Sequence, residues 1–166
     1  TLDGAEHLRR SRQGDFAAIE WLNENVEGIA VILEAPGDHY EAYTYTGRVS
    51  AFTGLPTLLG WGGHQHQWRG NYDEPAVREP DIERLFSTED ILEAVELLEQ
   101  YNVEYVYIGP EEWSRYPATG LAKFAQLSDV VYDTGGVVIY RYEPGAVESL
   151  FVNYAPGQPV PVQEIP

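Results

Sequence analysis

The sequence predicts an α/β fold, a three-layer sandwich with a mixed, mainly parallel sheet and an antiparallel edge hairpin. Residues 29–33 are a short run that is apolar on both faces, as expected for a central parallel strand flanked by helices, and residues 103–108 are predicted to form another buried strand. Each run follows a segment with helical periodicity, which is typical of a βαβ unit with a right-handed crossover. Two further β-branched runs flank the Asp-Thr-Gly-Gly sequence at 133–136, a good hairpin turn for the sheet edge.

The first helix is predicted for residues 15–25, after a polar and slightly basic segment at 1–14 that we expect to pack on the surface. Asp15 occupies the position of an N-cap, and Gly28 ends the helix. The apolar face of this helix comprises Phe16, Ile19 and Leu22, widened by Ala17, Ala18 and Trp21. Glu34 follows the first strand, where open α/β sheets place their ligand sites, and is therefore a candidate binding residue.

Two segments without a persistent helix or strand period separate the predicted strands. Residues 43–70 contain six of the chain's 16 glycines, two of its four tryptophans and two of its four histidines. We expect them to form a long structured Gly/Trp-rich loop. Residues 71–86 are a polar connector, in which Pro75 and Pro80 argue against a long helix.

The rest of the chain continues the α/β pattern. A helix should run to about Tyr101 from a cap at Ser87 or Thr88, because Ser87 to Asp90 resembles a capping box. After the strand at 103–108 we expect a loop at 111–119, a short helix at 120–127, and strands at 130–132 and 137–142.

The predicted organisation is a single domain at 1–142 followed by a Pro-rich extended tail at 143–166. A chain of 166 residues buries roughly two thirds of its unfolded surface, so it needs no disulfide or metal to fold. Prolines break regular structure in the tail, except for a short strand at 150–154. The chain contains no methionine, even at its start, so we expect it to be a piece of a longer protein.

Charge and cysteine content exclude several classes of function. A formal charge of -17 argues against nucleic acid and anionic bilayers as partners, because both require a basic patch. The absence of cysteine excludes a disulfide scaffold, thiol catalysis and cysteine-based zinc sites. No apolar run is long enough to span a membrane, which predicts a soluble chain.

The Gly/Trp-rich segment carries the residue types of a sugar-binding surface. Aromatic faces such as Trp61 and Trp68 stack on the apolar face of a pyranose, while planar polar groups bind its hydroxyl groups. Arg48, His64 and Arg69 supply such groups, as does Gln65. The alternative is that both tryptophans are buried and only anchor a long loop to the sheet.

A metal site is a weaker interpretation of the same segment. His64 and His66 invite it, with His39 or Glu34 as further ligands. Histidines two residues apart point to opposite sides of an extended chain, and no His-Glu-x-x-His pattern supports them. We therefore predict neither a metal nor a cofactor.

Other charged residues allow both a functional and a structural interpretation. Arg48 and Arg69 could hold a phosphate bidentately, but salt bridges to the chain's 27 acids are the simpler expectation. Glu111 and Glu112 invite comparison with a glycosidase pair, although adjacent acids in a loop usually form a solvated face. The chain contains no Gly-x-Ser-x-Gly elbow and neither standard Gly-rich phosphate loop, so an independent hydrolase lacks support.

The central segment carries a recognisable set of residues: Arg48, Ser50, Thr53-Gly54-Leu55-Pro56, Gly60-Trp61, His64 and Trp68-Arg69-Gly70. This set resembles the signature of the YYY family of polytopic membrane proteins, a family of unknown function. Flanking matches extend the resemblance over about residues 2–142, including Glu34 and the Tyr-x-Val-x-Tyr-Val-Tyr-x-Gly sequence at 101–109. One departure is Gln65, where the family pattern leads us to expect glutamate.

Members of this family resemble membrane glycosyltransferases that use lipid-phosphate sugar donors. The resemblance implies that this chain is their C-terminal soluble domain, on the extracytoplasmic side of the cell membrane, with its own transmembrane domain as partner. In that class the catalytic carboxylate lies in the membrane part, so this domain would recognise sugar or a lipid-linked substrate without catalysing transfer. The alternative is a purely structural module that packs on the transmembrane part. The implied substrate-binding residues are Glu34, Arg48, Trp61, His64, Trp68 and Arg69.

Overall fold

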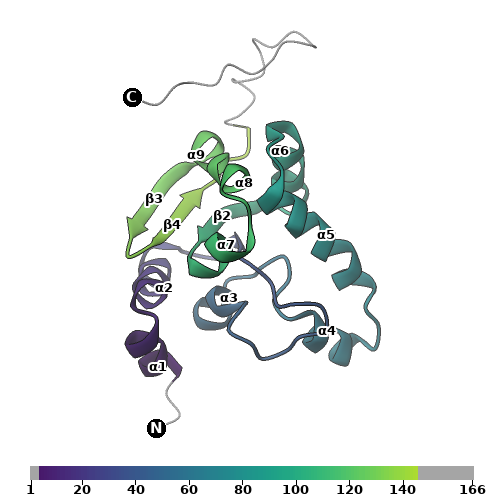
Figure 1. Cartoon of the computed structure of the whole chain (residues 1–166). Helices are drawn as coiled ribbons and strands as arrows, with labels where there is room; N and C mark the ends of the chain where they lie inside the picture. The colour runs from purple at the N-terminus through teal and green to yellow at the C-terminus, as the bar shows by residue number, and fades with distance from the viewer. Residues whose placement is uncertain (1–3, 146–166) are drawn as a thin grey trace.

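The computed structural model describes residues 4–145, which fold around a mixed sheet (Figure 1). Its strands are β1 (Val31–Leu33), β2 (Val103–Ile108), β3 (Asp129–Thr134) and β4 (Val137–Arg141). They lie in the order β1-β2-β4-β3, with β1 parallel to β2 and the other pairings antiparallel. The predicted α/β fold with a mixed sheet and an antiparallel edge hairpin is confirmed. The sheet has fewer parallel pairs than expected, because β4 lies between β2 and β3 and pairs antiparallel with both.

Helices cover both faces of this sheet (Figure 1). On one side α2 (Gln13–Asn25) packs against β3 and β4, and on the other α6 (Ile91–Gln100) packs against β2. The remaining helices are α1 (Gly4–Ser11), α3 (Arg48–Thr53), α4 (Gly62–Arg69), α5 (Asp73–Ser87), α7 (Pro110–Arg115), α8 (Ala118–Ala122) and α9 (Phe124–Leu127).

Two hydrophobic cores lie on opposite faces of the sheet, as the predicted three layers require. Successive side chains of β2 alternate between them: Tyr107 belongs to the core beneath α2, and Val106 and Ile108 belong to the core beneath α5 and α6. The neighbouring strand follows the same alternation, with Ile32 in the first core and Leu33 in the second. The end of the strand at 106–108 is therefore continuously apolar because both of its faces are covered, whereas Glu104 near its start is exposed.

The prediction that prolines prevent a helix in residues 71–86 was wrong, because α5 occupies 15 residues from Asp73 to Ser87. Pro75 lies in the first turn, where the missing N–H has no intrahelical acceptor. Pro80 lies inside the helix, where it costs about 3 kcal/mol. Burial of Ile82 and of Leu85, each 0% exposed, offsets that cost, since each such side chain contributes about 1.5–3 kcal/mol.

The cap of α6 also differs from the prediction, whereas the end of the helix near Tyr101 is confirmed. Ser87 is the last residue of α5 and does not cap the next helix. The N-cap is Asp90, whose Oδ1 accepts hydrogen bonds from the backbone N–H groups of Leu92 at 2.9 Å and Glu93 at 3.3 Å. A carboxylate at this position also suits the positive end of the helix dipole.

Residues 43–70 are not one long loop, since they contain the helices α3 and α4. The glycines that obscured the helical pattern end these helices: Gly54 and Gly70 have φ values of 76° and 74°, a left-handed conformation that favours glycine. The loop predicted at 111–119 was likewise wrong, because α7 occupies most of it with Pro110 in its first turn. The segment at 1–14 contains α1, and the expected strand at 150–154 lies outside the described residues.

Lys123, the only lysine, is expected to make the stability of the fold depend on pH. The residue is 2% exposed, and its Nζ donates a hydrogen bond to the Gly120 carbonyl oxygen at 2.6 Å. Burial lowers the pKa of Lys123 from 10.5 to about 8. Between these values the unfolded chain binds more protons than the folded chain, so the free energy of unfolding should rise with pH.

Lys123→Met should remove this slope and raise the free energy of unfolding at pH 7, because no charge is then buried. Urea unfolding between pH 7 and about pH 10 measures both effects. The range ends there because tyrosine side chains titrate at about pH 10 and would add their own pH dependence. Equal slopes in the variant and the wild type would contradict the assignment.

Candidate functional site

The carboxyl ends of the parallel strands β1 and β2 converge on a buried ionic cluster around Arg48. Arg48 is the first residue of α3 and is 2% exposed. Its Nη2 lies 2.8 Å from Glu112 Oε2, and its Nε lies 3.2 Å from Asp15 Oδ1. Burial opposes the charged guanidinium, but the two carboxylates outweigh it and raise the pKa of Arg48. The usual ligand position of an open α/β sheet is therefore filled by the chain's own side chain.

The two carboxylates of this cluster are held by further hydrogen bonds. Asp15 accepts from the Tyr107 hydroxyl at 2.6 Å and from the Tyr45 hydroxyl. Glu112 accepts from the backbone N–H of Ala35 at 2.8 Å and of Gly109 at 2.9 Å. The cluster ties α2, α3, α7 and both parallel strands together, which is a structural role.

Glu34 caps the N-terminus of α3, although it lies outside that helix in the sequence. Its carboxylate is 0% exposed and accepts from the backbone N–H groups of Val49 at 2.8 Å and Ser50 at 2.7 Å. These are donors of the first helical turn, and Gly47 at the N-cap position has no side chain to satisfy them. Burial raises the pKa of Glu34, while these hydrogen bonds and Arg48 act in the opposite direction.

The six predicted binding residues therefore do not form one site. Glu34 and Arg48 are buried, whereas Trp61, His64, Trp68 and Arg69 gather on and beside α4. The Arg69 side chain is 53% exposed and forms an ion pair with Glu74. Both arginines thus adopt the salt-bridged arrangement that was the simpler expectation for them.

Four aromatic side chains at the surface form what we call the ring cluster: Tyr43, Trp61, His64 and Trp68. Ring centroids are 5.4 Å apart for Tyr43 and Trp61, 5.2 Å for Tyr43 and His64, and 5.9 Å for His64 and Trp68. His64 and Trp68 share a face of α4 because they are four residues apart, and the Trp68 indole N–H donates to His64 Nε2.

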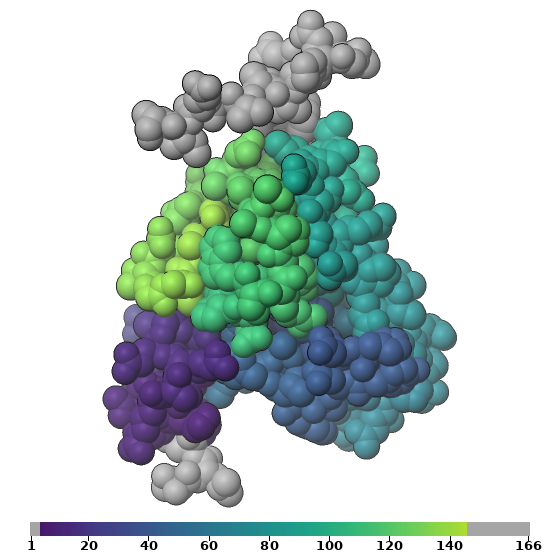
Figure 2. All heavy atoms as spheres, in the orientation of Figure 1, coloured from purple at the N-terminus to yellow at the C-terminus, as the bar shows by residue number. Residues whose placement is uncertain are grey.

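The two tryptophans of the ring cluster have different surroundings. Trp61 is partly buried, and its indole N–H donates to the Thr46 carbonyl oxygen at 2.5 Å, so this ring anchors the preceding loop. Trp68 is 78% exposed and Tyr43 is 70% exposed. The anchoring interpretation therefore holds for Trp61 but not for Trp68. Figure 2 shows the segment that carries them, in blue, as a continuous part of the surface at one end of the molecule.

Backbone conformation marks the loop before α3 as strained. Tyr40 and Tyr43 have φ values of 62° and 59°, in the left-handed region, which costs roughly 1–2 kcal/mol for a residue with a side chain. Gly63 in α4 permits this arrangement: its N–H donates to the Glu41 carbonyl oxygen at 2.9 Å, and a Cβ there would lie 2.1 Å from the Tyr40 carbonyl oxygen. Strain of this kind is typical of functional sites.

Tyr43 was not among the predicted site residues, nor was a second group of rings formed by His39, Tyr40, His66 and Tyr72. In this group Tyr40 stacks on Tyr72 with centroids 4.3 Å apart, and His39 Nδ1 lies 2.8 Å from Glu79 Oε2. The dense Tyr-Glu-Ala-Tyr-Thr-Tyr sequence at 40–45 was a signal that could have indicated these residues.

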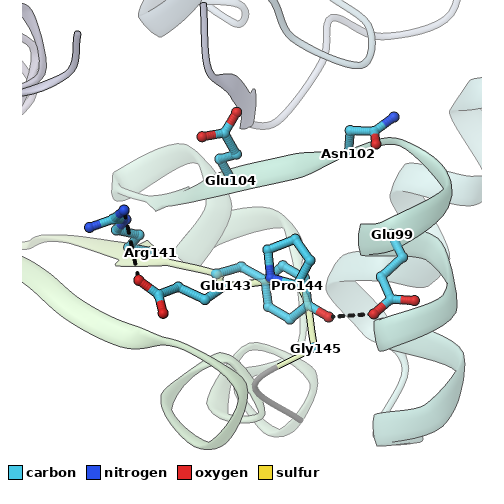
Figure 3. A pocket seen from close by; sticks show the side chains of 8 residues that line it. Glu99, Asn102, Glu104, Arg141, Glu143, Pro144 and Gly145 are labelled. Carbon is cyan, nitrogen blue, oxygen red and sulfur yellow. Dashed lines mark hydrogen bonds and ion pairs between the residues drawn. The ribbon is translucent and has the colours of Figure 1, made fainter. Parts of the chain in front are cut away.

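Two cavities among the described residues are lined by no member of the ring cluster. One of about 300 Å³ separates the loop after β1 from α5 and α7 and is lined by Asp38, Glu79, Glu83 and Arg115 among others. Another of about 710 Å³, shown in Figure 3, lies at the amino end of β2, with Glu99 and Glu104 in its wall. None of the six predicted binding residues lines either cavity.

The adjacent acids Glu111 and Glu112 do not form a glycosidase pair. Glu112 is 0% exposed and belongs to the Arg48 cluster, while Glu111 lies 3.6 Å from Arg12 in an ion pair. Within residues 4–145 no group of three or more His, Cys, Asp or Glu side chains is arranged to hold a metal ion. In the same part of the chain, no helix combines the length and apolarity needed to cross a membrane.

Comparisons with known proteins establish no family for the chain. No protein-family model matches it, and no curated protein matches it. Among solved structures it is similar to the C-terminal globular domain of an oligosaccharyltransferase from Archaeoglobus fulgidus, with 16% identity and a TM-score of 0.46. That similarity covers 76% of this chain and 95% of the other chain. A similarity at this level does not establish an activity for this chain.

Proposed function

We propose that the chain is the extracytoplasmic domain of a membrane glycosyltransferase of the YYY family, and that it recognises sugar through the ring cluster without catalysing transfer. The observation that carries this proposal is the exposure of Trp68 and Tyr43, at 78% and 70%, within a set of rings in mutual contact. Trp61, His64 and Trp68 also belong to the sequence motif that resembles this family.

The chemistry of the ring cluster suits a pyranose. An exposed indole face stacks on the C–H face of a sugar, and such rings lose little conformational freedom on binding. His64 contacts both Tyr43 and Trp68. Its Nε2 accepts from the Trp68 indole N–H, which leaves Nδ1 to form a hydrogen bond with a sugar hydroxyl group. Trp61, fixed by its bond to Thr46, supports the rings that face solvent.

The burial of three carboxylates and their hydrogen bonds and ion pairs within the chain support sugar recognition rather than catalysis by these groups. Glu34 accepts hydrogen bonds from the first turn of α3, and Asp15 and Glu112 form ion pairs with Arg48. A general acid or base must reach its substrate, and these groups are enclosed. In this proposal, as the family resemblance implies, transfer of sugar belongs to the membrane part of the parent protein.

Trp68→Ala should weaken binding of neutral oligosaccharides by about tenfold, or roughly 1.4 kcal/mol, because the main stacking face is lost. Isothermal titration calorimetry with mannotriose and N,N′-diacetylchitobiose measures this change. Trp113→Ala is a matched control, since Trp113 is 46% exposed on α7 and is not a member of the ring cluster.

Equal affinities for wild type and Trp68→Ala would contradict the proposal, as would the absence of binding by the wild type at millimolar sugar. Equal affinities would show that the sugar binds elsewhere on the domain. Absence of binding would favour the structural module that packs on the transmembrane part. In that case Trp68→Ala should instead weaken association between this domain and its membrane part.

A further inference from the structure

The chain has 10 basic side chains, and all of them lie in the described residues. Lys123 is buried, and every arginine lies within 3.7 Å of a carboxylate oxygen. The acids number 27, so this pairing leaves a large acidic excess on the surface. Across residues 4–145, therefore, the structure presents no unpaired arginine or lysine to an anionic ligand.

The cation nearest in sequence to the ring cluster is Arg69, directly after Trp68. Its Nη1 pairs with Glu74, and the same carboxylate pairs with Arg78 at 2.5 Å. A phosphate that bound bidentately through Nη1 of Arg69 would have to displace Glu74 from that arginine. That exchange replaces one anion with another, so it offers little net gain in a field that is already negative.

Helix N-termini, the other common anion-binding device, are also occupied beside the ring cluster. The carboxylate of Glu34 already accepts from the first turn of α3. At the start of α4, the Gly63 N–H donates to the Glu41 carbonyl oxygen. The first turn of α5 carries Asp73 and Glu74, which repel an anion.

The exposed rings favour a sugar ligand, and the pairing of the arginines with carboxylates argues against an anionic one. We propose that the ring cluster binds the uncharged pyranose part of its substrate and discriminates against sugar phosphates, so that a lipid-linked substrate is held by its glycan and not by its phosphate. The inference rests on the proposed function. A neutral pyranose meets the indole face without electrostatic cost, whereas a phosphate beside it meets an acidic surface on which the adjacent cation, Arg69, is already paired with Glu74.

The test compares mannotriose and N,N′-diacetylchitobiose with the 1-phosphate of each, by isothermal titration calorimetry at low salt. We expect each neutral sugar to bind about tenfold more tightly than its phosphate, with the gap closing as salt screens the acidic surface. Tighter binding of the phosphates, still lost in Trp68→Ala, would overturn this inference and leave the proposed function intact. Failure of both forms to bind would overturn the two together.

Glu74→Gln provides a second test within the same experiment, because it frees Arg69 beside Trp68. Affinity for the 1-phosphates should rise several-fold in this variant, whereas affinity for the neutral sugars should not change. The matched control is Glu96→Gln, which removes one charge from an exposed residue of α6 outside the ion pairs described above. An equal response of both variants would show that net charge alone sets the preference, and would contradict a role for the Arg69–Glu74 pair.

Discussion

Arg48→Met should lower the free energy of unfolding by about 3–5 kcal/mol, the usual cost of removing one partner from a buried ion pair. Asp15 is 1% exposed and Glu112 is 0% exposed, so water cannot replace the missing guanidinium. Urea unfolding at pH 7 measures the loss. Arg10→Met is the control, because the Arg10 side chain is 74% exposed, and its replacement should change stability by about 0.5 kcal/mol or less.

The loss of stability in Arg48→Met distinguishes a structural role of Arg48 from a role in ligand binding. A residue that holds a phosphate at the surface can be replaced with loss of binding and little loss of stability. A change below about 1 kcal/mol in Arg48→Met would therefore contradict the buried cluster and restore Arg48 as a candidate ligand.

Glu34→Ala should lower the free energy of unfolding by about 2–4 kcal/mol, because the backbone N–H groups of Val49 and Ser50 then lose their acceptor. Glu34→Gln retains one side-chain oxygen and should lose less. Thermal and urea unfolding of the two variants give the comparison. Equal stability of Glu34→Ala and wild type would show that the first turn of α3 is satisfied in another way.

Local patterns were sufficient to predict elements whose signals lie within a few residues. The strand at 103–108 and the Gly-Gly hairpin turn agree with β2 and the β3–β4 connection. The helix predicted at 15–25 corresponds to α2, but α2 begins at Gln13, so Asp15 lies in its first turn and is not its N-cap. Elements whose stability depends on distant contacts were missed. α5 tolerates Pro80 because its opposite face is buried, and α3 begins at a glycine because Glu34 supplies the cap.

The candidate site was predictable in part. The sequence indicated Trp61, His64 and Trp68, which do lie together, because they fall within eight residues of one helix and its start. It could not separate Arg48 from them, because the acids that bury Arg48 lie 33 and 64 residues away in the chain. Tyr43 was missed because its exposure depends on a left-handed backbone that the sequence does not signal.

Indole N–H signals in a 15N NMR titration test the central claim most directly. With mannotriose added to the wild-type chain, we expect the Trp68 signal to shift most and the Trp61 signal to follow. The Trp113 signal should stay in place, since that side chain lies on α7 outside the ring cluster. A titration in which Trp68 does not move, or in which Trp113 moves as much, would contradict sugar recognition by the ring cluster.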